Sequence, residues 1–204
     1  MQPTVNDAIH IGVFGGSFDP PHIAHFICSR IAAEWLGLSK LLVIPAATQP
    51  CKLAGTSASA ELRCEMIQAL IRDDPLFELS RIEIDRGGIS YTVDTLKKLI
   101  ELYPSPEYKL HFLIGADALS EMDEWHDPEA IFSIAKVAVM MRPGIDPFRE
   151  NNRWAERALR VEIPRLEISS TTVRQRIAVG LSVRLMVGSE VDDIIRGNRL
   201  YQIG

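Results

Sequence analysis

The stretch Ile11-Gly-Val-Phe-Gly15-Gly16-Ser-Phe-Asp-Pro20-Pro-His22-Ile-Ala-His25 decides the fold of this chain. It begins with apolar residues, contains two glycines and then two prolines, and continues with apolar residues at helical spacing. This order predicts a strand, a turn and a helix. Glycine lets the backbone approach a ligand closely, and the first amides of a helix have no partner within it. The pattern therefore predicts an anion site at the turn. His22 and His25 fall one turn apart, on one face of the first helical turn, where both point at the anion.

Composition limits the classes of protein to consider. With 204 residues, 47% hydrophobic content and a net charge of −5, we expect one domain that buries a full core and has no basic face for nucleic acid. The three cysteines form no C-x-x-C pair, which favours reduced thiols in a cytoplasmic protein. The sequence contains no secretory pattern at its start and no apolar stretch long enough to span a bilayer.

Strand and helix patterns alternate along the rest of the chain, which is typical of an α/β protein with an open parallel sheet. Gly37 is expected to end the first helix, and Ser59 to cap a helix that runs to about residue 72. The other predicted helices cover 92–103, 152–159, 169–179 and 187–201. The predicted strands cover 40–45, 77–85, 109–115, 135–141 and 161–164.

The string Gly-Gly-Ser-Phe-Asp-Pro-Pro-His-x-x-His resembles the signature of the nucleotidyltransferases with an H-x-G-H element, and most closely the bacterial nicotinate mononucleotide adenylyltransferases. Four further motifs follow in the family's order, so the resemblance extends from about Ile9 to Tyr201. They are Gln49-Pro50-Cys51-Lys52, Ser90-Tyr91-Thr92 with Asp94-Thr95-Leu96, Arg142-Pro143-Gly144, and Ile168-Ser-Ser-Thr-Thr-Val-Arg174. The chain departs from the family at Ala24, where glycine is usual, and at Cys51, where histidine is usual.

This resemblance implies a Rossmann-like, doubly wound, mainly parallel sheet with helices on both faces, in a single nucleotidyltransferase domain over 1–204 whose helical part from about 165 to 204 packs on it. It implies transfer of AMP from ATP to nicotinate mononucleotide, giving deamido-NAD and pyrophosphate, with Mg²⁺ bound mainly through the ATP phosphates. The implied catalytic residues are His22, His25, Lys52 and Arg174. The residues implied to bind ATP are Gly15, Gly16, Ser17, Phe18, Gly115, Asp117, Ser169 and Ser170. Those implied to bind nicotinate mononucleotide are Tyr91, Thr92, Trp125 and Arg142.

Each of these residues also has a purely structural interpretation. Thr92 can cap a helix beside a packing tyrosine, and the two serines at 169 and 170 can cap another helix. Asp117 can cap a helix or accept hydrogen bonds from a ribose, and Trp125 can anchor a surface helix. Asp19 is interpreted as a turn residue. Only the agreement of several motifs favours the functional interpretation.

Two other functions remain open at this stage. A non-catalytic sensor of ATP or of pyridine nucleotides is favoured if Ala24 and Cys51 weaken phosphate alignment. A metal-binding protein that uses His22, His25 and a cysteine lacks a nearby fourth ligand at zinc-site spacing. The chain contains neither G-x-x-x-x-G-K-[ST] nor G-x-G-x-x-G, the phosphate-binding loops of other nucleotide-binding families.

Overall fold

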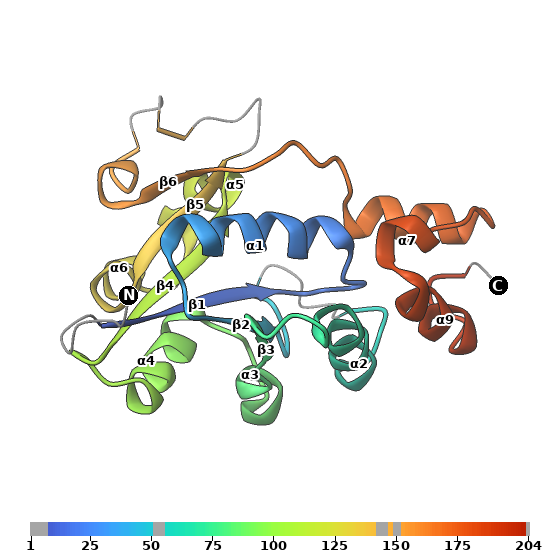
Figure 1. The fold of residues 1–204 in the computed structure, drawn as a ribbon, viewed down its shortest axis with the longest axis horizontal. Helices are drawn as coiled ribbons and strands as arrows, with labels where there is room; N and C mark the ends of the chain where they lie inside the picture. The colour runs from blue at the N-terminus through green and yellow to red at the C-terminus, as the bar shows by residue number, and fades with distance from the viewer. Residues whose placement is uncertain (1–7, 51–55, 142–146, 149–151, 203–204) are drawn as a thin grey trace.

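The sheet of this protein is open and parallel. A computed structural model describes residues 8–50, 56–141, 147–148 and 152–202. Its six strands stand in the order β3-β2-β1-β4-β5-β6, and every neighbouring pair is parallel, which confirms the predicted α/β architecture (Figure 1). The strands are β1 (Ile9–Gly16), β2 (Lys40–Pro45), β3 (Phe77–Leu79), β4 (Tyr108–Gly115), β5 (Lys136–Met141) and β6 (Leu159–Glu162).

Helices cover both faces of the sheet, and each face has its own apolar cluster (Figure 1). On one face lie α1 (Ile23–Leu36) and part of α2 (Ala60–Ile71), packed on the β1, β2 and β5 side chains that point that way. On the other lie α4 (Thr92–Leu102), α5 (Ala116–Ser120) and α6 (Pro128–Ile134). Alternate residues of a strand point to opposite faces, so near-continuous apolar strands such as β2 can supply both clusters.

The predicted ends of several elements are confirmed. Gly37 takes a left-handed conformation with φ of 64° and ends α1, and β2 stops at Pro45 as expected. The hydroxyl of Ser59 accepts the Leu62 N–H at 3.2 Å and caps α2. Ser169 caps α7 (Ser170–Ala178) in the same way. These signals are local, so the sequence is sufficient to locate them.

The strand predicted over 77–85 is wrong in its second half. β3 has only three residues, and α3 (Ile82–Arg86) follows it. The period-two pattern suggested that Glu83 faces solvent, but this side chain is buried and accepts a hydrogen bond from Thr95. β3 pairs only with residues 41–43 of β2, which itself ends two residues later at a proline. Beyond the paired residues, the ladder therefore offers a longer β3 only two more positions, one of them a proline without an N–H.

Three other predictions need correction. Within the described part of 152–159, only the short η2 (Ala155–Arg157) is helical, and β6 begins at Leu159 rather than at residue 161. Within the last predicted stretch, 187–201, the helix is α9 (Ser189–Gly197); a separate short helix, α8 (Arg184–Val187), precedes it across Gly188, which has a φ of 87°. On α1, Ile27 and Trp35 of the apolar stripe are exposed, and smaller side chains form most of the buried face.

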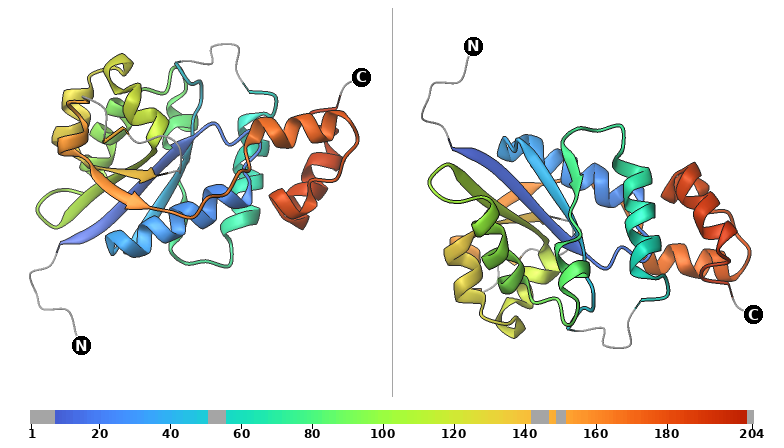
Figure 2. Two further views of the ribbon diagram at one scale, coloured as in Figure 1. Left: turned by 90° about the horizontal axis from the view of Figure 1, so that it is seen from above. Right: turned by 90° about the horizontal axis from the view of Figure 1, so that it is seen from below.

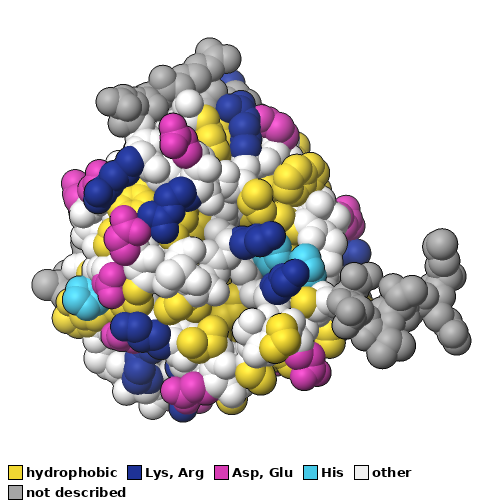
Figure 3. All heavy atoms as spheres, turned by 90° about the vertical axis from the view of Figure 1, so that its left-hand side faces the viewer, with side chains coloured by type: hydrophobic (Ala, Val, Ile, Leu, Met, Phe, Trp, Pro, Cys, Tyr) yellow, Lys and Arg dark blue, Asp and Glu magenta, His cyan; other side chains and the backbone are white. Residues whose placement is uncertain are grey.

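The C-terminal helices form a third apolar cluster with α2. Met66 of α2 is fully buried there among Val173, Val187 and Val191, and Figure 2 shows these helices, in orange and red, gathered beside α2 at one end of the molecule. α2 thus connects the sheet to the C-terminal helices. Charged side chains of both signs are interspersed over the face drawn in Figure 3. None of the described helices is both long and apolar enough to cross a membrane.

A histidine pair, His10 partly buried and His111 fully buried, joins β1 to β4. The Nε2 of His111 lies 3.0 Å from the Nδ1 of His10, and the two rings are stacked with centroids 4.9 Å apart. The His111 side chain is 3% exposed, and burial lowers its pKa to about 4, with smaller contributions from His10, Lys136 and Lys109. In the unfolded chain a histidine has a pKa of about 6.5.

Because the pKa of His111 is lowered in the folded protein, we predict a loss of stability in mild acid. Below pH ~6.5 the unfolded chain takes up a proton that folded His111 rejects, so stability is complete above that pH and is lost as the pH falls towards about 4. The loss amounts to at most about 3 kcal/mol. The variant His111→Leu should show a shallower decline in urea-unfolding free energy between pH 7 and pH 5. The control His126→Gln, which removes an exposed imidazole, should follow the parent chain. Equal slopes for all three proteins would contradict this account.

Candidate active site

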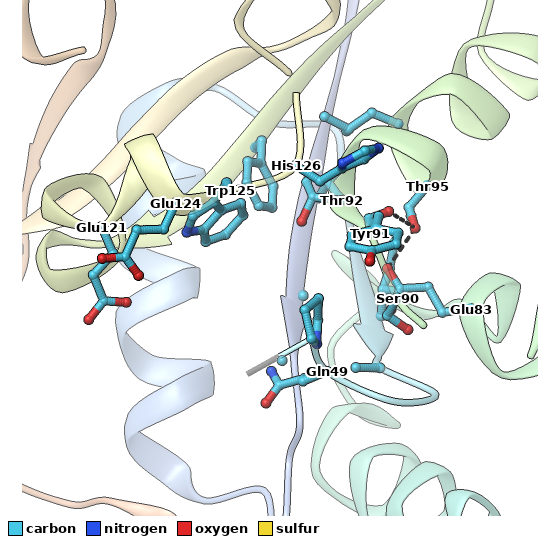
Figure 4. A pocket seen from close by; sticks show the side chains of 18 residues that line it. Gln49, Glu83, Ser90, Tyr91, Thr92, Thr95, Glu121, Glu124, Trp125 and His126 are labelled. Atoms are coloured by element: carbon cyan, nitrogen blue, oxygen red, sulfur yellow. Dashed lines mark hydrogen bonds between the residues drawn. The ribbon is translucent and has the colours of Figure 1, made fainter. Parts of the chain in front are cut away.

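A cavity of about 590 Å³ opens at the carboxyl ends of β1 and β2. This is the edge at which open parallel sheets bind ligands, close to the point where the chain switches from one side of β1 to the other. Figure 4 shows Trp125 on one side of the cavity and Tyr91, Thr92 and His126 on the other. Its lining includes five of the residues predicted to bind substrates, Gly15, Gly16, Tyr91, Thr92 and Trp125.

The start of α4 forms one wall. Tyr91, not Thr92 as predicted, is the N-cap residue, and Thr92 is the first residue of the helix. Ser90 joins this wall to the loop after β2, because its hydroxyl accepts the Ala47 N–H at 2.9 Å and its N–H donates to the Thr48 carbonyl at 2.8 Å. The first amides of a helix lack partners within it and carry the positive end of the helix dipole. The wall therefore suits a carboxylate.

Glu83 and Thr95 form a buried pair at the base of this wall, and both line the cavity. The Thr95 hydroxyl donates to Glu83 Oε1 at 2.7 Å and accepts from Arg86 Nη2 at 3.1 Å. These bonds connect α3 to the first turn of α4. Sequence reasoning missed Glu83, because an acidic residue in a period-two pattern indicates an exposed position.

Aromatic rings define the opposite side and the rim. Trp125 follows η1 (Met122–Glu124) and packs against Phe112 of β4 in an edge-to-face arrangement, with ring centroids 6.0 Å apart. His126, which sequence reasoning also missed, lies over the Tyr91 ring at 4.6 Å. Glu121 and Glu124 complete this side of the lining. The cavity between Trp125 and the start of α4 thus offers aromatic faces on which a flat ring can stack (Figure 4).

The predicted histidine pair lies at the start of α1. His22 is the N-cap residue, so only His25 belongs to the helix itself, and the prediction of two helical histidines is half right. The rings stack with centroids 3.5 Å apart, and the backbone N–H of His22 donates to Nδ1 of His25 at 3.2 Å. Because Nδ1 accepts, the proton of a neutral His25 ring lies on Nε2. His25 thereby presents an N–H donor beside the amides of the helix N-terminus.

The segment between β1 and α1 differs from the predicted glycine turn. Gly15 and Gly16 lie within β1, and the positive φ of 48° belongs to Phe18, whose ring is buried in the core. A Cβ on Gly16 would lie 3.2 Å from the Phe18 ring, so a larger residue there would require that ring to shift by a few tenths of an ångström. With its side chain buried, Phe18 can meet a nucleotide only through its backbone.

The structure brings α7 against this segment. Ser170 Oγ donates to the Pro20 carbonyl at 2.8 Å, and Arg174 Nη1 donates to the Asp19 carbonyl at 2.7 Å. The Ser169 hydroxyl accepts the Thr172 N–H and caps the helix. These three predicted ATP-contacting residues therefore lie beside the segment that leads to the histidine pair. Sequence analysis indicated neither carbonyl contact.

The remaining predicted residues lie elsewhere or cannot be located. Gly115 ends β4 and is the N-cap residue of α5, and Asp117 is exposed in the first turn of that helix, not at its cap. Both lie at the carboxyl edge of the sheet. Lys52, with the neighbouring Cys51, and Arg142 lie outside the described residues. Among the residues that are described, no three His, Cys, Asp or Glu side chains come together as a metal site.

Comparisons with known proteins agree with this arrangement. Several relatives carry the name "Probable nicotinate-nucleotide adenylyltransferase". The protein from Desulfitobacterium hafniense is 36% identical over 95% of this chain and 96% of its own length, and that from Thermus thermophilus is 39% identical over 95% and 100%. The Plasmodium falciparum nicotinic acid mononucleotide adenylyltransferase complexed with NaAD has the same fold, with a TM-score of 0.76, 20% identity and coverage of 95% and 97%.

The cytidylyltransferase-like family model matches residues 13–176, which span every described part of the histidine turn, the cavity and α7 up to Arg174. This chain therefore belongs to the cytidylyltransferase-like family and, within it, to the nicotinate-nucleotide adenylyltransferases.

Proposed function

We propose that this protein transfers the adenylyl group of ATP to the 5′-phosphate of nicotinate mononucleotide, forming deamido-NAD and pyrophosphate. One observation carries the proposal: the cavity between Trp125 and the start of α4 is continuous along Gly15 and Gly16 with the strand end that leads to the histidine pair. A pyridine site and an anion site therefore lie along one strand end. The names of the relatives support this pairing of substrates.

The pyridine ring is proposed to stack on Trp125, with its carboxylate received by backbone amides at Tyr91 and Thr92. The α4 dipole favours a negative charge at that place. The Tyr91 N–H also contacts the Ile89 carbonyl at 3.2 Å, a long bond that a carboxylate can replace. We propose that Arg142, which closely follows β5, contacts the same substrate.

The triphosphate is proposed to lie at the start of α1. The Nε2–H of His25, the His22 ring and the amides at the start of α1 supply donors for the α- and β-phosphates, and Lys52 and Arg174 supply positive charge. Ser17, Phe18, Ser169 and Ser170 are proposed to line the phosphates. Gly115 and Asp117, at the carboxyl edge of the sheet, are proposed to contact the ribose of ATP.

The chemistry makes modest demands on the protein. A phosphate monoester has a second pKa near ~6, so the attacking phosphate is largely a dianion at neutral pH and needs no general base. The protein must align two anions in line and neutralise the charge that develops on the α-phosphate and the pyrophosphate. We propose that a Mg²⁺ ion, held by phosphate oxygens and water, adds further neutralising charge.

The direct test is to incubate the purified protein with Mg-ATP and nicotinate mononucleotide and to measure pyrophosphate and the dinucleotide. Formation of both in equal amounts is expected. If both substrates bind but no product forms, the protein is a nucleotide sensor and the proposal fails. If the protein uses another nucleoside triphosphate in preference to ATP, the proposed nucleotide donor is wrong.

We predict that His22→Ala lowers kcat by about 10²- to 10³-fold, the range for loss of one donor that stabilises a transition state. The comparison variant His10→Ala removes an imidazole near the opposite end of β1 and should leave kcat unchanged. Steady-state rates with both substrates saturating provide the measurement. A kcat for His22→Ala within a few fold of the parent would refute the assigned role.

We predict that the acid substrate is preferred over the amide. A carboxylate accepts from both backbone N–H donors at Tyr91 and Thr92. The NH₂ group of a carboxamide cannot accept, so it leaves one of these donors without a partner. A buried unpaired donor costs roughly 1–3 kcal/mol. The ratio of kcat/KM for nicotinate over nicotinamide mononucleotide should therefore be on the order of ten to several hundred.

The variant Trp125→Ala separates stacking from this discrimination. Loss of the indole should raise KM for both pyridine mononucleotides. The ratio of their kcat/KM values should stay nearly unchanged, because stacking on the ring does not distinguish a carboxylate from a carboxamide. A ratio that collapses to one in the variant, or equal use of both substrates by the parent, would show that the start of α4 does not form the carboxylate pocket.

A further inference from the structure

The segment Ser17–Pro20 is held by side chains from distant parts of the chain. The Ser17 carbonyl accepts from Arg63 Nη1 at 2.8 Å, the Asp19 carbonyl from Arg174 Nη1 at 2.7 Å, and the Pro20 carbonyl from Ser170 Oγ at 2.8 Å. Three of its four carbonyls are thus fixed by donors from α2 and α7. His22 lies two positions after Pro20, the last residue of this segment.

The Asp19 side chain adds a second set of contacts. Its carboxylate is 6% exposed and accepts the Ser57 N–H at 2.8 Å, the Ala58 N–H at 3.1 Å and the Tyr201 hydroxyl at 2.7 Å. A buried carboxylate is tolerated only when donors surround it. Asp19 therefore joins the loop before α2 and the residues after α9 to the histidine turn.

The backbone after α9 is arranged so that Tyr201 reaches this carboxylate. Arg199 and Tyr201 have φ values of 51° and 63°, in the left-handed region that non-glycine residues rarely adopt. Such conformations persist only where the surrounding structure requires them. Burial and the bond to Asp19 raise the Tyr201 pKa, so the phenol remains a donor at any physiological pH.

Arg63 provides the positive charge on the other side of the segment. Its side chain is 1% exposed, burial lowers its pKa, and the charge of Asp19 opposes that shift more than any other group does. Within the described residues Arg63 Nε has no hydrogen-bond partner, and Arg63 forms no ion pair there. Its observed polar contact is the Ser17 carbonyl. Burying a cation without a paired anion is costly, so the contact with the Ser17 carbonyl indicates that Arg63 serves to order that segment.

We propose that Tyr201, Asp19 and Arg63 are positioning residues for adenylyl transfer, which place His22 and the first amides of α1 against the reacting phosphates without touching substrate. This inference rests on the function proposed above. In-line transfer needs reacting atoms placed within a fraction of an ångström, and a displacement of about 1 Å can cost a factor of 10² in rate. The cavity for the pyridine lies elsewhere, since none of the three residues lines it.

The test is the variant Tyr201→Phe, which removes one hydroxyl and keeps the ring. We expect kcat to fall about 10-fold or more, and KM for nicotinate mononucleotide to stay within about twofold. Tyr108→Phe, at the start of β4, removes a hydroxyl at the far end of the sheet and should change neither constant. Arg63→Lys provides a second variant, because an ammonium loses the planar geometry of the contact with Ser17; a kcat-specific loss is again expected.

A readout independent of turnover completes the test. Amide hydrogen exchange at Ser57 and Ala58, which donate to Asp19, should be faster in Tyr201→Phe than in the parent and unchanged in Tyr108→Phe. If the parent makes no dinucleotide, the proposed function fails while the exchange result still decides whether Tyr201 orders this segment. If the parent is active and Tyr201→Phe and Arg63→Lys both retain its kcat, or if KM rises as much as kcat falls, the positioning role is wrong.

Discussion

The position of β1 between β2 and β4 is the constraint on which the rest of the structure depends. The chain builds outward from β1 to β2 and β3, then returns to place β4 on the other side of β1. Connections therefore leave the carboxyl end of β1 uncovered, and both the cavity and the histidine turn lie there. The apolar strands and the two helical layers serve to hold this one strand end in place.

A chain with a net charge of −5 must bind its anionic substrates through local features. Backbone amides at the starts of α1, α4 and α7 provide partial positive charge without adding ionisable groups. This arrangement explains why few cations are needed at the described part of the site and why the overall charge is a poor guide to its ligands.

Local patterns predicted most of the strands and several helix ends, because each is determined by residues a few positions apart. Ser59 and Gly37 are examples, and so is the start of α4 to within one residue. The role of Asp19 could not be predicted, since its carboxylate binds partners 38, 39 and 182 positions away. Glu83 misled the strand prediction because its partner, Thr95, lies twelve positions away on another helix. Where a polar side chain is buried, the donor that permits it is found only in the folded chain.

The bonds to residues 17–20 also bear on how the protein folds. They join positions separated by 46, 150, 155 and 182 residues, whereas β1 and α1, which flank the segment, are adjacent in the sequence. Contacts at such separations carry a large loop-closure cost and form only once much of the chain is already ordered. The turn between β1 and α1 is therefore expected to gain its final shape among the last events of folding, after most of the sheet has formed.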